Sequence, residues 1–275
     1  IMDIMADALR HSVHLTSTFC DCSQSLNHLA HRFSLQPLFP LIGTIPSPDG
    51  QHFPLVTHRA KSMIQLLLTS SWIDNDNNLL FPNLINPLAP PQSDLHTLAE
   101  FKTGHIYRLE YDLLFCGCPN HVMCGIILYI DKLAVDRYGH LSLEPVYFTL
   151  SLFNQKTHNK PQAWRPLGYI PNIGLMSKAE SRHSMTSSQK VQLYHDILAR
   201  ILDPLIQLQK ADAMPFSLLY RGQHYNLKLM FPLLAVLGDT ESHDCLCGRY
   251  NMRSIKTSRL CRHCDTPTLE TASVD

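Results

Sequence analysis

The sequence has no long hydrophobic run and no net charge. No apolar segment approaches the ~20 residues that a helix needs to cross a bilayer, and the N-terminus lacks the charged and then apolar layout of a signal peptide. These absences predict a soluble intracellular protein with no membrane partner. The chain has 23 Lys and Arg against 23 Asp and Glu, which argues against a protein that binds nucleic acid over its whole surface.

The signatures of three enzyme classes are absent as well. There is no Gly-rich phosphate loop, no G-x-S-x-G and no H-E-x-x-H. The sequence therefore lacks the motifs of nucleotide hydrolases, serine hydrolases and zinc proteases. With 45% hydrophobic and 17% charged residues the composition is globular, and 275 residues suffice for one large or two modest domains. We expect a fragment of a longer protein, because the chain opens at Ile1 and closes at Asp275 without a clear structural stop.

Three regions are predicted along the chain. Residues 1–104 form a mostly irregular and helical region with a Pro-rich linker; dense Pro and Gly predict a loop at 35–54, and helical spacing predicts a helix at 58–71. Residues 105–244 alternate between strand and helix patterns and form the core. Residues 245–275 hold a cysteine-rich insertion and the tail.

The core is predicted to be an α/β fold with a mixed sheet. The segment at 125–131 is apolar and rich in β-branched and aromatic residues, which is typical of a strand buried on both faces. Three antiparallel strands, a crossover helix and a strand parallel to the first are the skeleton of an RNase H-like fold. The predicted elements are strands at 125–131, 143–153 and 161–170, a helix at 190–209, a short strand at 216–220 and a strand at 231–238.

Two of these strands end in an aspartate. Asp131 follows the first predicted strand and Asp239 follows the last. If the two strands are parallel neighbours, their carboxylates meet at one sheet edge and can bind Mg²⁺ or Mn²⁺. Two such cations about 4 Å apart clamp the attacking and leaving oxygens of a phosphodiester. Alternatives stay open, since Asp131 could pair with Lys132 or cap a turn. Glu241 and Asp244 are rivals of Asp239 as ligands.

The C-terminal region has the strongest metal-ligand pattern. Two close pairs of cysteines are separated by thirteen residues, a spacing that fits a tetrahedral zinc knuckle. A nearby histidine could replace one thiolate. The alternative is that the four thiols are unrelated. The Zn²⁺ ligand candidates are Cys245, Cys247, Cys261 and Cys264, with His263 or His243 as substitutes.

A basic and aromatic segment precedes the third predicted strand. Between Ser151 and Arg200 the chain has seven Lys or Arg and two acids, which indicates a local basic face. Such a surface can meet backbone phosphates and stack on an unpaired base. The alternative is a solvated loop around one buried Trp. The nucleic-acid-binding candidates are Lys156, Lys160, Trp164 and Arg165.

Several sequence blocks, taken in their order, resemble one family. They are Ile127-Leu-Tyr-Ile-Asp-Lys132, Leu143-Glu-Pro-Val-Tyr-Phe-Thr-Leu150, Trp164-Arg-Pro-Leu-Gly-Tyr-Ile-Pro171, Leu237-Gly-Asp239 and the cysteine cluster at 245–264. Together they resemble Plavaka-type transposases, which belong to the Kyakuja, Dileera and Zisupton group of DNA transposons. The resemblance implies an RNase H-like DDE core with a zinc insertion after the second acid.

The resemblance also implies roles for individual residues. Asp131 matches the first acid of the core and Asp239 the second. The third acid, a glutamate on a later helix, is expected beyond the zinc insertion, and Glu270 is not assigned to it. The implied cofactors are Mg²⁺ or Mn²⁺ and Zn²⁺. The expected partner is DNA at transposon ends, with a homo-oligomer as one state of the chain and the nucleus as its location.

Two functions follow from these observations. The first is a transposase-derived protein whose core cleaves and rejoins DNA strands if the third acid is present in the full-length protein. The second is a catalytically dead nucleic-acid-binding module that zinc stabilises. Only the first function predicts a nuclease activity, which mutation of an aspartate would remove.

Overall fold

The structure is a computed structural model of the chain. It describes residues 40–48, 50, 52–69, 104–115, 121–134, 142–173, 185–211, 213–220 and 222–247. The chain divides into two compact units, Ile1–Phe39 and Pro40–Asp275, and every described residue belongs to the second. Within this part the fold is mixed α/β, as predicted.

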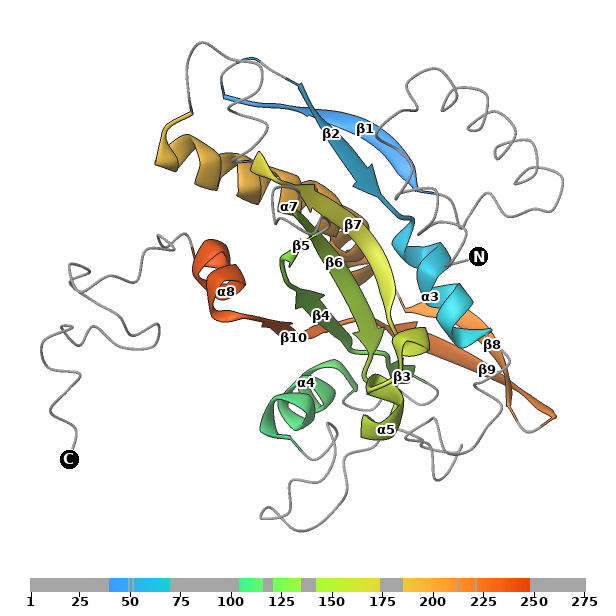
Figure 1. Ribbon diagram of the computed structural model, residues 1–275. Helices are drawn as coiled ribbons and strands as arrows, with labels where there is room; N and C mark the ends of the chain where they lie inside the picture. Colours follow the sequence, from blue (N-terminus) through green and yellow to red (C-terminus); the bar gives the residue numbers. More distant parts are fainter. Residues whose placement is uncertain are drawn as a thin grey trace, which may run out of the picture. The chain divides into compact units, whose positions relative to one another are not determined.

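The main sheet has seven strands (Figure 1). Its order is β1-β2-β7-β6-β4-β10, and β5 pairs with β6 beyond the end of β4. Every pairing is antiparallel except the one between β4 and β10, which is parallel. The strands are β1 (Leu41–Pro46), β2 (His52–Thr57), β4 (Ile126–Ile130), β5 (Leu133–Ala134), β6 (Ser142–Leu150), β7 (Arg165–Pro171) and β10 (Leu233–Gly238).

A second sheet has three strands, in the order β3-β9-β8. They are β3 (His121–Met123), β8 (Met214–Tyr220) and β9 (Gln223–Met230). The last two form an antiparallel hairpin in which Tyr220 pairs with Gln223. The turn between them contains Gly222 at φ 74°, a backbone conformation that glycine adopts without a Cβ clash.

The helices are α3 (Ala60–Leu68), α4 (His105–Phe115), α5 (Gln155–His158), the 3₁₀ turn η5 (Pro161–Ala163), α7 (Ser187–Lys210) and α8 (Thr240–Leu246). Among the described helices, none combines the length and the apolar composition that a membrane span requires.

Helix α7 connects β7 to the second sheet and packs on the main sheet. Its buried side chains recur every three or four residues and include Leu193, Ile197 and Ile201, so one stripe faces inward. Thr186 caps the first turn in a reciprocal capping box with Gln189. Gly168 of β7 lets the helix approach, because a Cβ there would lie 2.8 Å from Cγ1 of Ile201. The predicted helix at 190–209 is therefore confirmed.

The predicted strands of the core are also found. The segments at 125–131 and 231–238 contain β4 and β10, the segment at 143–153 contains β6 except Ser142, and the segment at 161–170 contains η5 and most of β7. The predicted strand at 216–220 is the second half of β8. Its hairpin partner β9 was not predicted.

The predicted loop at 35–54 is wrong for its described part. Residues 41–46 and 52–57 form the hairpin β1–β2, which extends the main sheet through the pairing of β2 with β7. The prolines are tolerated because β1 is an outer strand and because β2 pairs with β7 only at Val56 and Thr57, away from Pro54. Helix α3 packs on α7 and β7. Residues 40–69 thus join the same unit as the core, and the predicted linker before residue 104 lies outside the described residues.

Candidate functional site

Strands β4 and β10 bring the two predicted acids together. They pair in parallel, with Gly238 opposite Ile130 at the last step of the register. Neighbouring strands lie about 4.8 Å apart, so Asp131 and Asp239 leave the same sheet edge side by side. The parallel pairing expected from the sequence is confirmed, and it places the two aspartates directly after neighbouring strand ends.

Gly238 makes this close approach feasible. A Cβ built on this residue would overlap the carbonyl oxygen of Ile130 and would lie 3.3 Å from Cβ of Ser242. The first of these atoms belongs to the backbone of a central strand and cannot turn away. Glycine therefore lets the end of β10 and the start of α8 lie against the end of β4.

Asp131 is tied to a tyrosine on its own strand. The hydroxyl of Tyr129 donates a 2.6 Å hydrogen bond to Oδ2 of Asp131. The two side chains lie on the same side of the strand because they are two residues apart. This bond, then burial and the negative charges of Asp131 and Asp239 raise the pKa of Tyr129. Both carboxylates thus act on one hydroxyl, which stays protonated at neutral pH.

Asp239 caps the helix that follows β10. Its Oδ1 accepts a 2.7 Å hydrogen bond from the backbone N–H of Ser242, in the first turn of α8. Nε2 of His195 lies 2.9 Å from the carbonyl oxygen of Cys245, which attaches α8 to α7. A capping role is therefore present for Asp239. It does not exclude a metal, because a carboxylate has two oxygens and about four lone-pair sites.

A second tyrosine joins α7 to the sheet near this edge. The hydroxyl of Tyr194 donates a 2.8 Å hydrogen bond to Oε1 of Glu144 on β6. Burial is the main cause that raises the pKa of Tyr194, followed by the charges of Glu144, Cys245 and Asp239. Sequence reasoning missed both tyrosines. The two-residue spacing from Asp131 could have identified Tyr129, whereas nothing local in the sequence pairs Tyr194 with Glu144.

Asp131 and Asp239 carry oxygen ligands of the kind that a hard divalent cation prefers. Asp131 is half-buried and Asp239 is exposed, so a cation held between them could keep water or phosphate oxygens as its other ligands. Within the part of the chain that the structure describes, no three His, Cys, Asp or Glu side chains gather as a metal site. The side chains of Glu241 and Asp244 lie outside the described part. The two-cation arrangement therefore stays a prediction.

Half of the predicted zinc ligands can be located. Cys245 lies in the last turn of α8 and is half-buried, and Cys247 follows the helix and is exposed. His243 lies on the same helix. The other candidates, Cys261, His263 and Cys264, lie outside the described residues. The two located cysteines thus stand at one end of a short helix whose other end is capped by Asp239.

The predicted nucleic-acid residues lie in and around α5 and η5. Lys156 and Lys160 are exposed. Trp164 is half-buried, and its Nε1 donates a 2.7 Å hydrogen bond to the carbonyl oxygen of His158. Nη1 of Arg165 donates to the carbonyl oxygens of Gln162 and Trp164 at 2.8 Å each, and burial lowers the pKa of this guanidinium. The two lysines are the members of this set most open to a phosphate backbone.

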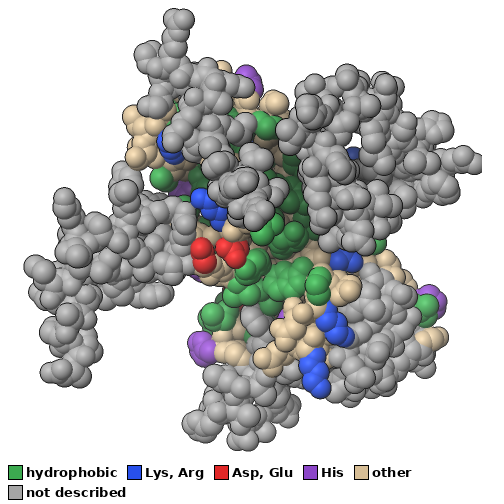
Figure 2. All heavy atoms as spheres, viewed as in Figure 1, with side chains coloured by type: hydrophobic (Ala, Val, Ile, Leu, Met, Phe, Trp, Pro, Cys, Tyr) green, Lys and Arg blue, Asp and Glu red, His purple; other side chains and the backbone are tan. Residues whose placement is uncertain are grey.

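The space-filling view shows where charge gathers on one face. In Figure 2 a small group of acidic side chains lies next to a larger area of hydrophobic side chains, with basic side chains above and below it. Such an arrangement can hold a cation locally while the surrounding basic groups attract an anionic polymer.

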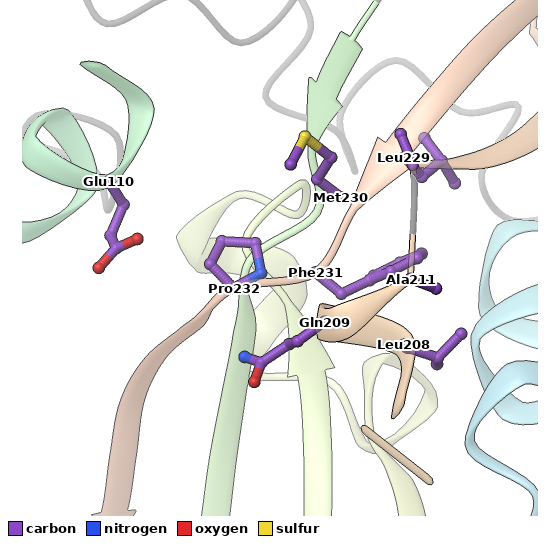
Figure 3. Close-up of a pocket in the computed structure, with 9 residues that line it drawn as sticks. Glu110, Leu208, Gln209, Ala211, Leu229, Met230, Phe231 and Pro232 are labelled. Carbon is purple, nitrogen blue, oxygen red and sulfur yellow. The ribbon is translucent and has the colours of Figure 1, made fainter. Parts of the chain in front are cut away.

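A cavity of about 220 Å³ lies at the other end of β10 (Figure 3). Its lining comes from the end of α7, from α4 and from the corner between β9 and β10. Phe231 and Pro232 line it just before β10 begins, whereas Asp239 follows the strand's last residue. Six strand residues span roughly 20 Å, so this cavity is separate from the acid pair.

Comparison with known proteins adds a family to this geometry. A family model described as Plavaka transposase matches residues 92–272. The match covers more than half of the chain and includes both aspartates, the basic and aromatic segment and all four C-terminal cysteines. Searches among curated proteins and among solved structures returned no match. The resemblance seen in the sequence blocks is confirmed, and the chain belongs to the Plavaka transposase family.

Proposed function

We propose that this transposase-derived chain carries a partial DDE-type core for metal-dependent cleavage and transfer of DNA strands. The observation that carries the proposal is the parallel pairing of β4 with β10, which sets Asp131 beside Asp239. Family membership implies DNA as the partner. Carboxylates at one open sheet edge are ligands suited to Mg²⁺ or Mn²⁺.

The strand order supports an RNase H-like arrangement of this core. Strands β7, β6 and β4 are joined antiparallel, α7 follows β7 in the chain, and β10 then adds parallel to β4. This is the order predicted from the sequence for such a skeleton. The hairpin β8–β9 is an addition between the crossover helix and the returning strand.

The proposal assigns metal binding and DNA binding to different residues of the chain. Asp131 and Asp239 hold a divalent cation at the sheet edge, and the exposed Lys156 and Lys160 contact the DNA backbone, with Trp164 and Arg165 beside them. When bound, Mg²⁺ supplies charge neutralisation at the phosphate and activates the attacking water or 3′-hydroxyl. The glutamate of a full DDE set is expected beyond the zinc insertion, so we propose that Asp131 and Asp239 form a partial site.

Replacement of Asp131 tests the proposal directly. A cation contributes several kcal/mol to such a transition state, so Asp131→Asn should lower the rate of Mn²⁺-dependent nicking of supercoiled DNA by about 100-fold or more. Asp112→Asn is the matched control, because Asp112 is an exposed aspartate on α4 and belongs to neither strand end. Nicking that is unchanged in Asp131→Asn would refute the assignment.

A second function is favoured by the incomplete set of acids. Two aspartates follow the neighbouring strand ends, no third ligand side chain joins a metal-binding group among the described residues, and Asp239 already caps α8. We therefore propose, as the alternative, a nucleic-acid-binding module without nuclease activity that zinc on Cys245, Cys247 and the later cysteines stabilises. A salt-dependent DNA titration combined with a nicking assay separates the two functions, since the module binds DNA but nicks with neither Mg²⁺ nor Mn²⁺.

A further inference from the structure

Tyr129 is the exception among the side chains of β4. Ile126, Leu128 and Ile130 are each 1% exposed, whereas Tyr129 is 38% exposed. A tyrosine in that position is not needed to fill the core. Its hydroxyl instead reaches Oδ2 of Asp131 at 2.6 Å, the short distance that is typical of a hydroxyl bound to a charged carboxylate.

The ring of Tyr129 is held from a second direction. Its edge packs against Trp164 with the ring centroids 6.0 Å apart and the planes at 67°. Trp164 is fixed in turn by the 2.7 Å hydrogen bond from Nε1 to the carbonyl oxygen of His158. Nε2 of His158 lies 3.0 Å from the carbonyl oxygen of Leu150, at the end of β6. The hydroxyl is therefore supported by a chain of contacts that starts in the sheet itself.

We propose that Tyr129 is a positioning residue for the cation site. It holds the carboxylate of Asp131 through Oδ2 and directs Oδ1 toward the cation that Asp131 and Asp239 share. This inference rests on the proposed function, because it assumes that the two aspartates bind a metal. Partners of this kind, which hydrogen-bond a ligating side chain, fix its orientation before the metal arrives.

The same contacts give Trp164 a role inside the fold. Its indole supports the ring of Tyr129, so it acts on the site through Tyr129 in addition to any contact with DNA. Removal of the tyrosine hydroxyl leaves the two rings in contact and removes only the link to Asp131. That separation makes Tyr129→Phe a clean test of positioning.

The test measures Mn²⁺ binding by the whole chain, without DNA and without turnover. Calorimetric titration is carried out on the wild type, on Tyr129→Phe and on Tyr147→Phe. Tyr147 is the cross-strand neighbour of Tyr129 on β6, so the control removes a hydroxyl from the same kind of residue at the same level of the sheet. We expect Tyr129→Phe to weaken Mn²⁺ binding by about 10-fold or more, which is the usual effect of removing a residue that hydrogen-bonds a metal ligand. Tyr147→Phe should bind Mn²⁺ like the wild type.

A structural role would give a different pattern. If Tyr129 only stabilised the fold, Tyr129→Phe would lower the thermal midpoint measured without metal and leave the Mn²⁺ affinity of the folded protein unchanged. That result overturns the inference. In an Asp131→Asn background, Tyr129→Phe should have no further effect on metal binding, and an equal effect in both backgrounds also overturns it.

The remaining outcomes are equally decisive. A wild type that binds no Mn²⁺ overturns the proposed function and the inference together. A wild type that binds, combined with an unaffected Tyr129→Phe, overturns the inference alone. If Tyr129→Phe does not fold, Trp164→Phe replaces it, since this change removes the bond to His158 and loosens the support of Tyr129. The expected result is then a smaller loss of Mn²⁺ affinity, and an unchanged affinity counts against the inference.

Discussion

The close approach of β10 to β4 at Gly238 leads to a sharp prediction about stability. Gly238→Ala puts a methyl group against the carbonyl oxygen of Ile130. The neighbour is a backbone atom of a strand that is paired on both sides, with β6 and with β10, so it cannot yield cheaply. Overpacking of this kind typically costs about 1–3 kcal/mol of unfolding free energy.

The matched control lies in the same sheet. A Cβ at Gly43 of β1 would meet nothing within 4 Å, and Gly43 is not among the residues at positive φ. Because glycine in a strand costs roughly 0.5–1 kcal/mol relative to alanine, Gly43→Ala should leave stability unchanged or raise it slightly. The two variants make the same chemical change, and the general gain from alanine in a strand cancels between them, so their difference, about 1–3 kcal/mol, isolates the contact with Ile130.

Urea unfolding followed by circular dichroism measures the difference. The two variants should have the same slope and different midpoints. Gly238→Ala should also weaken Mn²⁺ binding in the protein that remains folded, because it moves Asp239 away from Asp131. If Gly238→Ala and Gly43→Ala unfold at the same urea concentration, the contact with the carbonyl oxygen of Ile130 has no cost in unfolding free energy, and the reasoning is refuted.

Two further predictions concern the tail and high pH. Elemental analysis of the purified chain should find zinc at about one ion per chain, Cys247→Ser should lower that content, and a metal-free preparation would contradict the zinc assignment. Burial raises the pKa of Tyr169 to about 12. Its phenol is protonated in both states below pH 10; above that value the unfolded chain loses the proton first, so stability should fall as the pH rises toward 12. Tyr169→Phe should make this fall shallower, and an equal fall in both proteins would argue against the burial of this hydroxyl.

The sequence by itself determined the order of the core elements and the positions of the two acids. The apolar runs of β4 and β10, each closed by an aspartate, are local patterns, and so is the apolar stripe of α7. The pairing of β4 with β10 was expected from the RNase H-like skeleton, in which the strand after the crossover helix lies parallel to the first strand. The apolar runs, the two aspartates and the helical stripe were predictable because a short window of residues contains each pattern.

Only the tertiary structure decided which side chains support the two aspartates and the sheet around them. Tyr129 has neighbours on its own strand, but its support by Trp164 depends on how the turn before β7 folds back over β4. The bond between Tyr194 and Glu144 joins α7 to β6 across a long stretch of chain. The local proline and glycine content predicted a loop where β1 and β2 form strands. An outer position in a sheet tolerates these residues, whereas a central position does not. In each case the deciding contact links segments that no local window of the sequence contains.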